Sequence, residues 1–393
     1  MQASGAVTKV LLCLLFTFTF AASILYWDIA SRPSPQGNCI CLSAKSTFLP
    51  AQPRNFVLQV VDHYPQRLVE AVAVPDIENS SIFSVYYATL YNRIAASCGP
   101  TCDDSVTPES VALEKWPFAF VRRNVNCPGL FLESSFDAPA WRWPPPQLKS
   151  LPSYWQQAYT MQGRFPLLEG RFFTQRYSGG SALESVWTRE LIQSMVEQAL
   201  LKTLPGNYGN SETNCILSAL DVLNRQEKVR GKRWAVVGSE NPWAEACLLA
   251  AGAQHITTIE YGRITSLDER VATFRPSEFN QRAMHPDFEP FDGVLTFSSV
   301  EHSGLGRYGD ELNPWGDIIA IQRMWCVTKP GGVLVIGVMM GDGIEGNAHR
   351  MYGPQRYPHL TANWEPLFAG CGEQQVFAFS RCDPSANGSK DSL

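Results

Sequence analysis

Glu301 and His302 form a residue pair whose types and position could do acid–base chemistry. They end residues 291–302, which read FDGVLTFSSVEH, an apolar stretch led by an aspartate and closed by polar groups. Histidine titrates near neutral pH, so His302 could take a proton from a hydroxyl group while Glu301 orients the imidazole or helps to bind a substrate. The pair predicts a general base at the end of a buried strand. The alternative is a polar cap on the loop that follows.

A second polar segment, residues 347–356, follows the next buried strand. It supplies His349 as another candidate base, and Arg350, Tyr352 and Arg356 as candidate substrate-binding residues. Guanidinium forks match the oxygens of a carboxylate, sulfate or phosphate, so the two arginines predict an anionic acceptor such as a uronate. The alternative is that the arginines form surface salt bridges and that His349 only packs.

Gly238 and Glu260 have the spacing of a nucleotide-binding unit. Residues 234–253 read as a short apolar strand, a polar loop that contains Gly238 and Ser239, and an apolar helix. A second strand at residues 255–261 holds Glu260, 22 residues after Gly238. An acid at an offset of about 20 residues reaches ribose hydroxyl groups in dinucleotide folds. The alternative for Glu260 is a solvated acid at a strand end.

These polar groups need a sheet that brings the strand ends together. The strand–helix–strand unit and the buried stretches at 291–302 and 328–338 predict parallel strands. Asn241 and Pro242 predict the start of the first helix, and Ser181 with Glu184 a capping box for an earlier one. Ligands of open α/β sheets bind beyond the carboxyl ends of the strands. The residues expected at that edge are Gly238, Ser239, Glu240, Glu260, Tyr261, Ser298, Ser299, Glu301 and His302, with Ser277 or Glu278 near the end of a third strand.

The same segments resemble known families. Phe-Asp at 291–292, Glu-His at 301–302 and Lys-Pro-Gly-Gly at 329–332 are similar to the pattern of class I methyltransferases around their fourth and fifth strands. More narrowly, the segments at 170–180, 237–245, 298–310 and 347–356 resemble the domain of unknown function 268 family. That family is regarded as methyltransferase-like and has no assigned substrate.

The resemblance implies an α/β, Rossmann-like sheet of the methyltransferase type that binds S-adenosylmethionine. The cofactor-binding residues would be Gly238, Ser239, Glu260, Ser277 and Ser298, and helices ahead of the first strand would cover the cofactor, unless they only pack against the sheet. One departure stands out, since class I methyltransferases place an acid before a Gly-x-Gly-x-Gly loop and this chain has Val236 and only Gly238.

Two other functions therefore stay open. The first is a non-catalytic binding or scaffold protein that has lost the cofactor. The second is a nucleotide-sugar glycosyltransferase, which fits less well because the chain contains no Asp-x-Asp metal-binding motif. No metal site is expected.

The amino-terminal region predicts a membrane anchor. Residues 10–27 are apolar and uncharged, long enough to span a bilayer, and they lie between Lys9 and Asp28. The positive-inside rule then places the body in the lumen of the endoplasmic reticulum or Golgi. A cleaved signal peptide with a small-residue site near residues 21–23 is the alternative, and it delivers the body to the same compartment. Asn79 and Asn387 head glycosylation sequons that this location would make usable.

The cysteines fit an oxidising compartment. Outside the anchor there are ten, an even number that permits disulfides without fixing their pairing. Cys371 and Cys382 flank a final strand and could bridge, whereas Cys247 and Cys326 lie in apolar helical stretches and are expected to be small buried hydrophobes. The spacings of the amino-terminal cysteines match no common structural zinc site.

Composition limits the partners and the domain plan. The 393 residues carry a net charge of -5, so no basic field favours nucleic acid, and the expected partners are a small-molecule or glycan acceptor and the membrane. We expect a cytosolic tail at 1–9, the anchor at 10–27, a stem at 28–55, a small accessory region at 56–147, a helical lead-in at 148–231, the Rossmann-like domain at 232–383 and a tail at 384–393.

Overall fold

The computed structural model describes residues 57–59, 82–104, 120–132, 146–168, 184–372 and 374–382. All of them belong to one compact unit, Cys41–Leu393. Among these residues, no helix combines the length and the apolar character that a bilayer crossing requires. The predicted anchor at 10–27, the stem and both glycosylation sequons lie outside the described residues.

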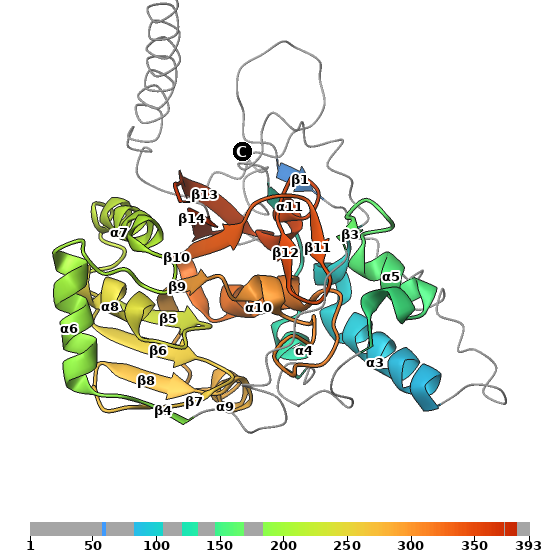
Figure 1. Cartoon of the computed structure of the whole chain (residues 1–393), viewed down its shortest axis with the longest axis horizontal. Helices are drawn as coiled ribbons and strands as arrows, with labels where there is room; N and C mark the ends of the chain where they lie inside the picture. Colours follow the sequence, from blue (N-terminus) through green and yellow to red (C-terminus); the bar gives the residue numbers. More distant parts are fainter. Residues whose placement is uncertain are drawn as a thin grey trace, which may run out of the picture. The chain divides into compact units, whose positions relative to one another are not determined.

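A seven-stranded mixed sheet forms the centre of the protein (Figure 1). Its strands, in spatial order, are β13 (Trp364–Ala369), β14 (Gln374–Arg381), β10 (Thr328–Met339), β9 (Phe291–Phe297), β5 (Arg233–Val237), β6 (His255–Ile259) and β8 (Val271–Phe274). Only β14 runs antiparallel to its neighbours. Renumbered along the chain from β5, the strands lie in the order 3-2-1-4-5-7-6. The expected α/β sheet of the methyltransferase Rossmann type is therefore confirmed.

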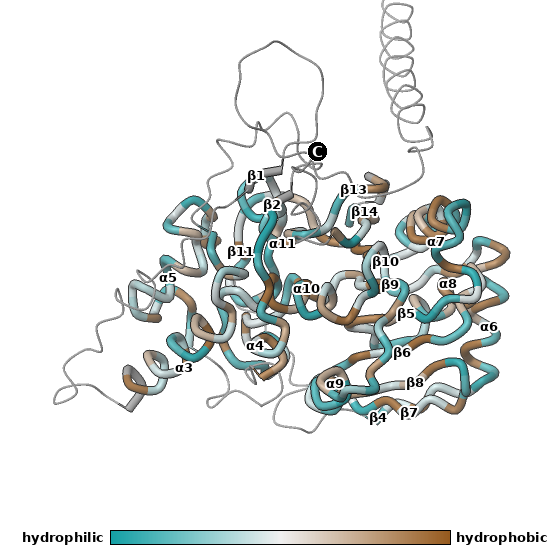
Figure 2. The backbone as a smooth tube through the Cα atoms, turned by 180° about the vertical axis from the view of Figure 1, so that it is seen from behind, coloured by the Kyte–Doolittle hydropathy of each residue, from teal (hydrophilic) through white to brown (hydrophobic). Residues whose placement is uncertain are grey.

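Helices cover both faces of this sheet. Alternate strand residues face two separate cores: Trp234 and Val236 pack with α6 (Arg189–Leu200), α7 (Asn210–Asn224) and α8 (Trp243–Ala250), whereas Ala235 packs with α9 (Pro276–Ala283), α10 (Gly316–Cys326) and α11 (Tyr357–Leu360). Figures 1 and 2 show α6, α7 and α8 together on one side. A strand buried on both faces needs apolar residues at consecutive positions, and this requirement explains the unbroken apolar stretches of β5, β9 and β10.

Several element boundaries differ from the sequence-based expectation. Helix α6 is capped by Thr188, whose side chain accepts a hydrogen bond from Leu191 N, so the predicted capping box of Ser181 and Glu184 is wrong. Glu184 instead opens the short strand β4 (Glu184–Trp187), which pairs with β7 (Arg263–Ser266). Helix α8 begins at Trp243 with Pro242 at the N-cap, one residue later than predicted from Asn241.

The described part of the chain before residue 184 packs on the loops that follow β9 and β10. It contributes β1 (Val57–Gln59), α3 (Ile82–Cys98), η2 (Gly99–Cys102), β2 (Phe120–Arg122), α4 (Cys127–Leu132), η5 (Leu148–Ser150), α5 (Ser153–Tyr159) and β3 (Leu167–Leu168). Trp155 and Tyr159 share a core with Trp315 and Ile344. Strand β3 also joins β11 (Gly343–Glu345) and β12 (His349–Met351) in a three-stranded sheet. This packing fixes the segment that carries the candidate substrate residues.

Three disulfides join cysteines in the part of the chain that the structure describes. They join Cys98 to Cys102, Cys127 to Cys326 and Cys215 to Cys371. The predicted bridge between Cys371 and Cys382 is therefore wrong, and Cys326 is bonded rather than a free buried hydrophobe. Cys247 is free and buried, as expected.

Candidate functional site

The loop after β5 is tightly constrained at Gly238. Its φ is +76°, and a Cβ built on it would lie 1.8 Å from the Ser299 Oγ. The Gly238 N–H donates to Ile259 O across the sheet, at 3.0 Å. Glycine is therefore required here both for its backbone conformation and for the close approach of the 298–301 segment.

Glu245 supports this loop from below, a role that sequence reasoning missed. The residue is fully buried in the first turn of α8 and accepts hydrogen bonds from the hydroxyl groups of Ser239, at 2.9 Å, and Thr258, at 2.7 Å. Burial raises its pKa to about 7, against the lowering effect of these hydroxyl donors. Ser239 is thus turned inward and structural, which leaves the backbone of the loop to face a ligand.

We expect Gly238→Ala to destabilise the fold by about 2–4 kcal/mol, because it adds an overlap with Ser299 to the cost of a positive φ. Gly331→Ala is the matched control, since Gly331 has φ +69° and nothing within 4 Å of its built Cβ. It should cost only about 1 kcal/mol. Urea unfolding of both variants measures the difference, and equal losses would show that the Ser299 contact has no energetic weight.

Glu260 lies at the end of β6 beside this loop, where the sequence predicted it. Its Oε1 accepts from the N–H groups of Tyr261, at 2.7 Å, and Gly262, at 3.3 Å. Burial raises its pKa to about 7, although these N–H groups oppose the shift. One carboxylate oxygen is therefore engaged by the turn itself.

Ser298 stands at the end of β9 in the left-handed region, with φ +47°. Such strain in a non-glycine residue persists only where the surroundings fix it, and it concentrates at functional sites. A hydrogen bond from the Ser298 hydroxyl lowers the pKa of the Tyr208 phenol, although burial raises it more. The Tyr208 ring packs against Phe297 with centroids 5.1 Å apart. Tyr208 precedes α7 and is 43% exposed, so the lead-in to that helix does reach the candidate site.

Glu301 is fully buried in the short helix η7 (Val300–His302). Within the described part of the chain, neither of its carboxylate oxygens has a hydrogen-bond partner of good geometry. Burial raises its pKa to about 7, and nearby N–H groups, the Ser298 hydroxyl and Arg307 only partly offset this effect. A buried carboxylate left in this state costs free energy, which indicates a functional demand.

His302 is oriented by a backbone carbonyl and not by Glu301. Its Nδ1 lies 2.6 Å from Ala348 O, so Nδ1 carries the proton and donates, whereas Nε2 lies 4.0 Å from Glu301 Oε1. Burial, and next the positive charge of Arg307, lower the pKa of His302 to about 3. The imidazole is therefore neutral and a weak base, and the idea that Glu301 orients it is corrected.

His349 comes close to His302, with ring centroids 6.3 Å apart. Its Nε2 lies 3.3 Å from Glu345 Oε2 on the neighbouring strand β11. Burial lowers the pKa of His349, and Glu345 opposes this shift. The structure thus brings the two candidate bases to the same edge, as the sequence predicted.

Arg350, Arg356 and Tyr352 do not face this edge, which corrects their prediction as acceptor-binding residues. All three are fully buried. Arg356 binds Asp317 through Nη2 at 2.6 Å and Nε at 2.8 Å, and the Tyr352 hydroxyl donates to Asp317 at 3.0 Å. Arg350 donates to Ser303 O at 2.7 Å and to Asn313 O at 3.2 Å. They hold the loop after η7 in place.

The third predicted strand end is confirmed, because β8 stops at Phe274 just before α9. Ser277 lies in the first turn of α9 at the carboxyl edge of the sheet. Glu278 accepts from Arg275 N at 2.9 Å and from the Arg275 guanidinium at 3.0 Å, so its carboxylate is committed to the start of the helix. Of these two residues, therefore, only Ser277 is not committed to the cap.

Comparison with protein families finds a match within the sheet domain. Residues 231–380 match the family described as Caenorhabditis protein of unknown function, DUF268. The match covers less than half of the chain, and the matched region is called the DUF268 domain below. No curated protein matches the sequence.

Solved structures resemble the DUF268 domain only distantly. One is a Burkholderia thailandensis 1,6-didemethyltoxoflavin-N1-methyltransferase with bound S-adenosylhomocysteine, 14% identical with a TM-score of 0.32, covering 43% of this chain and 79% of that one. Another is a putative S-adenosylmethionine dependent methyltransferase from Listeria monocytogenes, 9% identical with a TM-score of 0.28, covering 42% of this chain and 100% of that one. A third is the [4+2]-cyclase SpnF, 16% identical with a TM-score of 0.31, covering 52% of this chain and 76% of that one. The fold class of the DUF268 domain rests on its own strand order.

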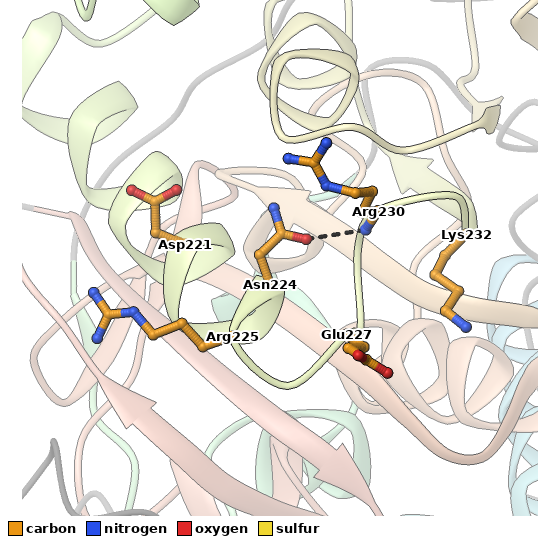
Figure 3. Close-up of a pocket in the computed structure, with 6 residues that line it drawn as sticks. All are labelled: Asp221, Asn224, Arg225, Glu227, Arg230 and Lys232. Carbon is orange, nitrogen blue, oxygen red and sulfur yellow. Dashed lines mark hydrogen bonds between the residues drawn. The ribbon is translucent and has the colours of Figure 1, made fainter.

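A pocket of about 720 Å³ opens at the opposite, amino-terminal edge of the DUF268 sheet (Figure 3). Its lining residues are Asp221, Asn224, Arg225, Glu227, Arg230 and Lys232. Asn224 accepts from Arg230 N at 3.0 Å and donates to Ala251 O at 2.7 Å, so its side chain holds the loop between α7 and β5 against the end of α8. Charges of both signs line this hollow, and Glu227 among them has a φ of +58°, whereas the buried carboxylates of Glu260 and Glu301 lie at the other edge. We therefore place the candidate site at the carboxyl ends of the strands.

Sequence reasoning missed three residues of the DUF268 edge, Tyr208, Arg307 and Tyr308. Arg307 Nη1 lies 3.4 Å from His302 Nδ1 and 3.2 Å from Ala348 O, and its guanidinium stacks on the Tyr308 ring at 5.2 Å. Position alone could have indicated Arg307 and Tyr308, since they follow closely on Glu301. Among the described residues, no group of three or more His, Cys, Asp or Glu side chains is placed to hold a metal ion.

Proposed function

We propose that the DUF268 domain is an S-adenosylmethionine-dependent methyltransferase. The observation that carries the proposal is the convergence of Gly238, Glu260, the strained Ser298 and the unsatisfied Glu301 at the carboxyl edge of a methyltransferase-type sheet. The donor set fits the cofactor, because Glu260 can accept from ribose hydroxyl groups and the loop backbone offers N–H groups with no Cβ at Gly238. When bound, S-adenosylmethionine supplies an electrophilic methyl group.

The protein's own part in such a reaction is to position the acceptor. His302 presents Nε2 at this edge with its ring fixed by Ala348 O, and His349 stands beside it. A pKa of about 3 makes His302 a hydrogen-bond acceptor rather than a strong base. We therefore favour an acceptor that loses its proton readily or is already ionised, such as a carboxylate on a small molecule or a glycan. Arg350 and Arg356 take no part in holding it.

The compartment belongs to the same proposal. We infer a membrane-anchored protein with its body in the lumen of the endoplasmic reticulum or Golgi. Residues 10–27 support this inference, as do the disulfides among the described residues, since such bonds are rare in reducing compartments. An acceptor in the secretory pathway follows from that location.

Calorimetric titration with S-adenosylmethionine and S-adenosylhomocysteine tests the proposal. We expect both to bind, and the affinity to fall roughly tenfold between pH 8 and pH 6. The sign and the size follow from Glu260, whose pKa of about 7 means that protonation at lower pH opposes binding to its ionised carboxylate.

A second candidate function is a non-catalytic scaffold. The engagement of Glu260 Oε1 by Tyr261 N and Gly262 N favours it, as do the side chains at residues 239–242 where class I methyltransferases have glycines. If neither ligand binds at millimolar concentration while circular dichroism shows a folded protein, the scaffold function stands and the methyltransferase proposal fails.

A further inference from the structure

Glu301 and Arg307 are opposite charges that are close together but do not satisfy one another. Neither Glu301 oxygen has a partner of good geometry within the described residues, and the buried Arg307 Nε has none there either. Arg307 is nevertheless near enough to lower the pKa of Glu301. Its Nη1 donates to Ala348 O at 3.2 Å and lies 3.4 Å from Nδ1 of His302, the residue next to Glu301.

Two unsatisfied groups of opposite charge define the chemistry of a matching ligand. Burial without a partner costs about 1–3 kcal/mol for a polar group and more for a charged one, so a ligand that satisfies both groups gains on each. An α-amino acid carries an ammonium group and a carboxylate on one carbon. Its ammonium can donate to Glu301 while its carboxylate accepts from Arg307.

The neighbours indicate where that amino acid comes from. Ser299, two residues before Glu301, is the residue that packs on Gly238, so the loop after β9 lies directly against the loop after β5. The negative charge of Glu301 contributes to the raised pKa of both Tyr208 and Tyr308, and the charge of Glu260 also raises the pKa of Tyr308. The ribose acid and the unsatisfied pair therefore border one site.

We infer that Glu301 and Arg307 hold the amino-acid end of S-adenosylmethionine, Glu301 accepting from its ammonium and Arg307 donating to its carboxylate. This inference rests on the proposed function. It assigns to the loop after β9 an acidic contact for which the first strand has only Val236. Because Glu301 has no exposed surface, binding requires a covering side chain to move.

The test compares two probes with the full-length protein by calorimetry. S-adenosylhomocysteine carries the amino-acid end, and 5′-methylthioadenosine lacks it. Glu301→Gln and Arg307→Met should each weaken S-adenosylhomocysteine binding by about 10- to 100-fold, the loss of one hydrogen bond to a charged group, and leave methylthioadenosine binding unchanged. Glu269→Gln, the same neutralisation at an exposed acid on the β7–β8 turn, should change neither affinity.

The outcomes separate the inference from the proposed function. Equal losses for both probes would mean that the pair only shapes the fold, and an unchanged affinity for S-adenosylhomocysteine would mean that it holds an amino-acid acceptor or nothing. Either result overturns the inference and leaves the methyltransferase proposal standing. If the wild-type protein binds neither probe, the proposed function fails and the inference fails with it. Thermal unfolding of each variant, compared with wild type, confirms that affinities refer to folded protein.

Discussion

Replacing Asp317 by alanine is expected to destabilise the protein by about 3–5 kcal/mol, the range for breaking a buried ion pair from one side. Asp317 is fully buried and forms an ion pair with Arg356 at 2.6 Å. It also accepts a hydrogen bond from the Tyr352 hydroxyl at 3.0 Å, and Arg350 Nε lies 3.6 Å away. Burial raises the pKa of Asp317, but the two arginines more than reverse this and hold the pKa below its ordinary value. Without Asp317, two buried guanidinium groups lose their counter-charge.

Urea unfolding at neutral pH measures this loss. Glu289→Ala is the control, since Glu289 pairs with Arg233 at 2.5 Å but is 62% exposed, and exposed pairs contribute about 0–1 kcal/mol. The pH dependence of stability follows from the depressed pKa of Asp317. Asp317 stabilises the fold at neutral pH, and this stabilisation is lost only as the pH falls through the folded pKa. A loss below 1 kcal/mol for Asp317→Ala would contradict the structural role assigned to these residues.

The same cluster shows why the sheet could be predicted from the sequence and the role of the arginines could not. Strands β5, β9 and β10 are buried on both faces and leave unbroken apolar stretches, and a positive-φ glycine and polar residues mark where β5 and β9 end. These are local signals. Whether Arg350 points to the sheet edge or to Asp317, 33 positions earlier, depends on how β12 packs on α10.

Long-range contacts also decided the features that the sequence did not reveal. Tyr208 reaches the site because the turn before α7 lies against Phe297, and Arg307 does so because Ala348 O anchors it. Neither contact is signalled in the sequence by a hydrophobic periodicity or by a motif. The position of Glu301 was predictable, but its unsatisfied carboxylate follows from the complete burial of η7. Local pattern therefore gave the edge of the sheet, and tertiary packing decided which side chains face it.

Disulfide pairing is the extreme case of a long-range contact, and it leads to the other large expected effect. Removing the Cys127–Cys326 bond with the double variant Cys127→Ala/Cys326→Ala should cost about 5 kcal/mol, because it releases a loop of sequence separation 199 in the unfolded chain. Removing Cys98–Cys102, with a separation of 4, should cost about 2 kcal/mol. Loop closure entropy grows with the logarithm of loop length, so the order of the two losses is the prediction.

Unfolding each protein with and without reductant separates the bond from the side chains removed with it. The Cys127–Cys326 variant should lose roughly half of the reductant sensitivity of the wild type, because the Cys215–Cys371 bond, with a separation of 156, remains. The Cys98–Cys102 variant should keep most of it. The reverse order would show that the long loop is already constrained in the unfolded chain. The proposed lumenal location requires the same bonds in the cell, so protein from cells lysed in a thiol-blocking reagent should be oxidised at Cys127 and Cys326. Blocked free thiols at both positions would place the domain in a reducing compartment and remove the main structural support for a secretory acceptor.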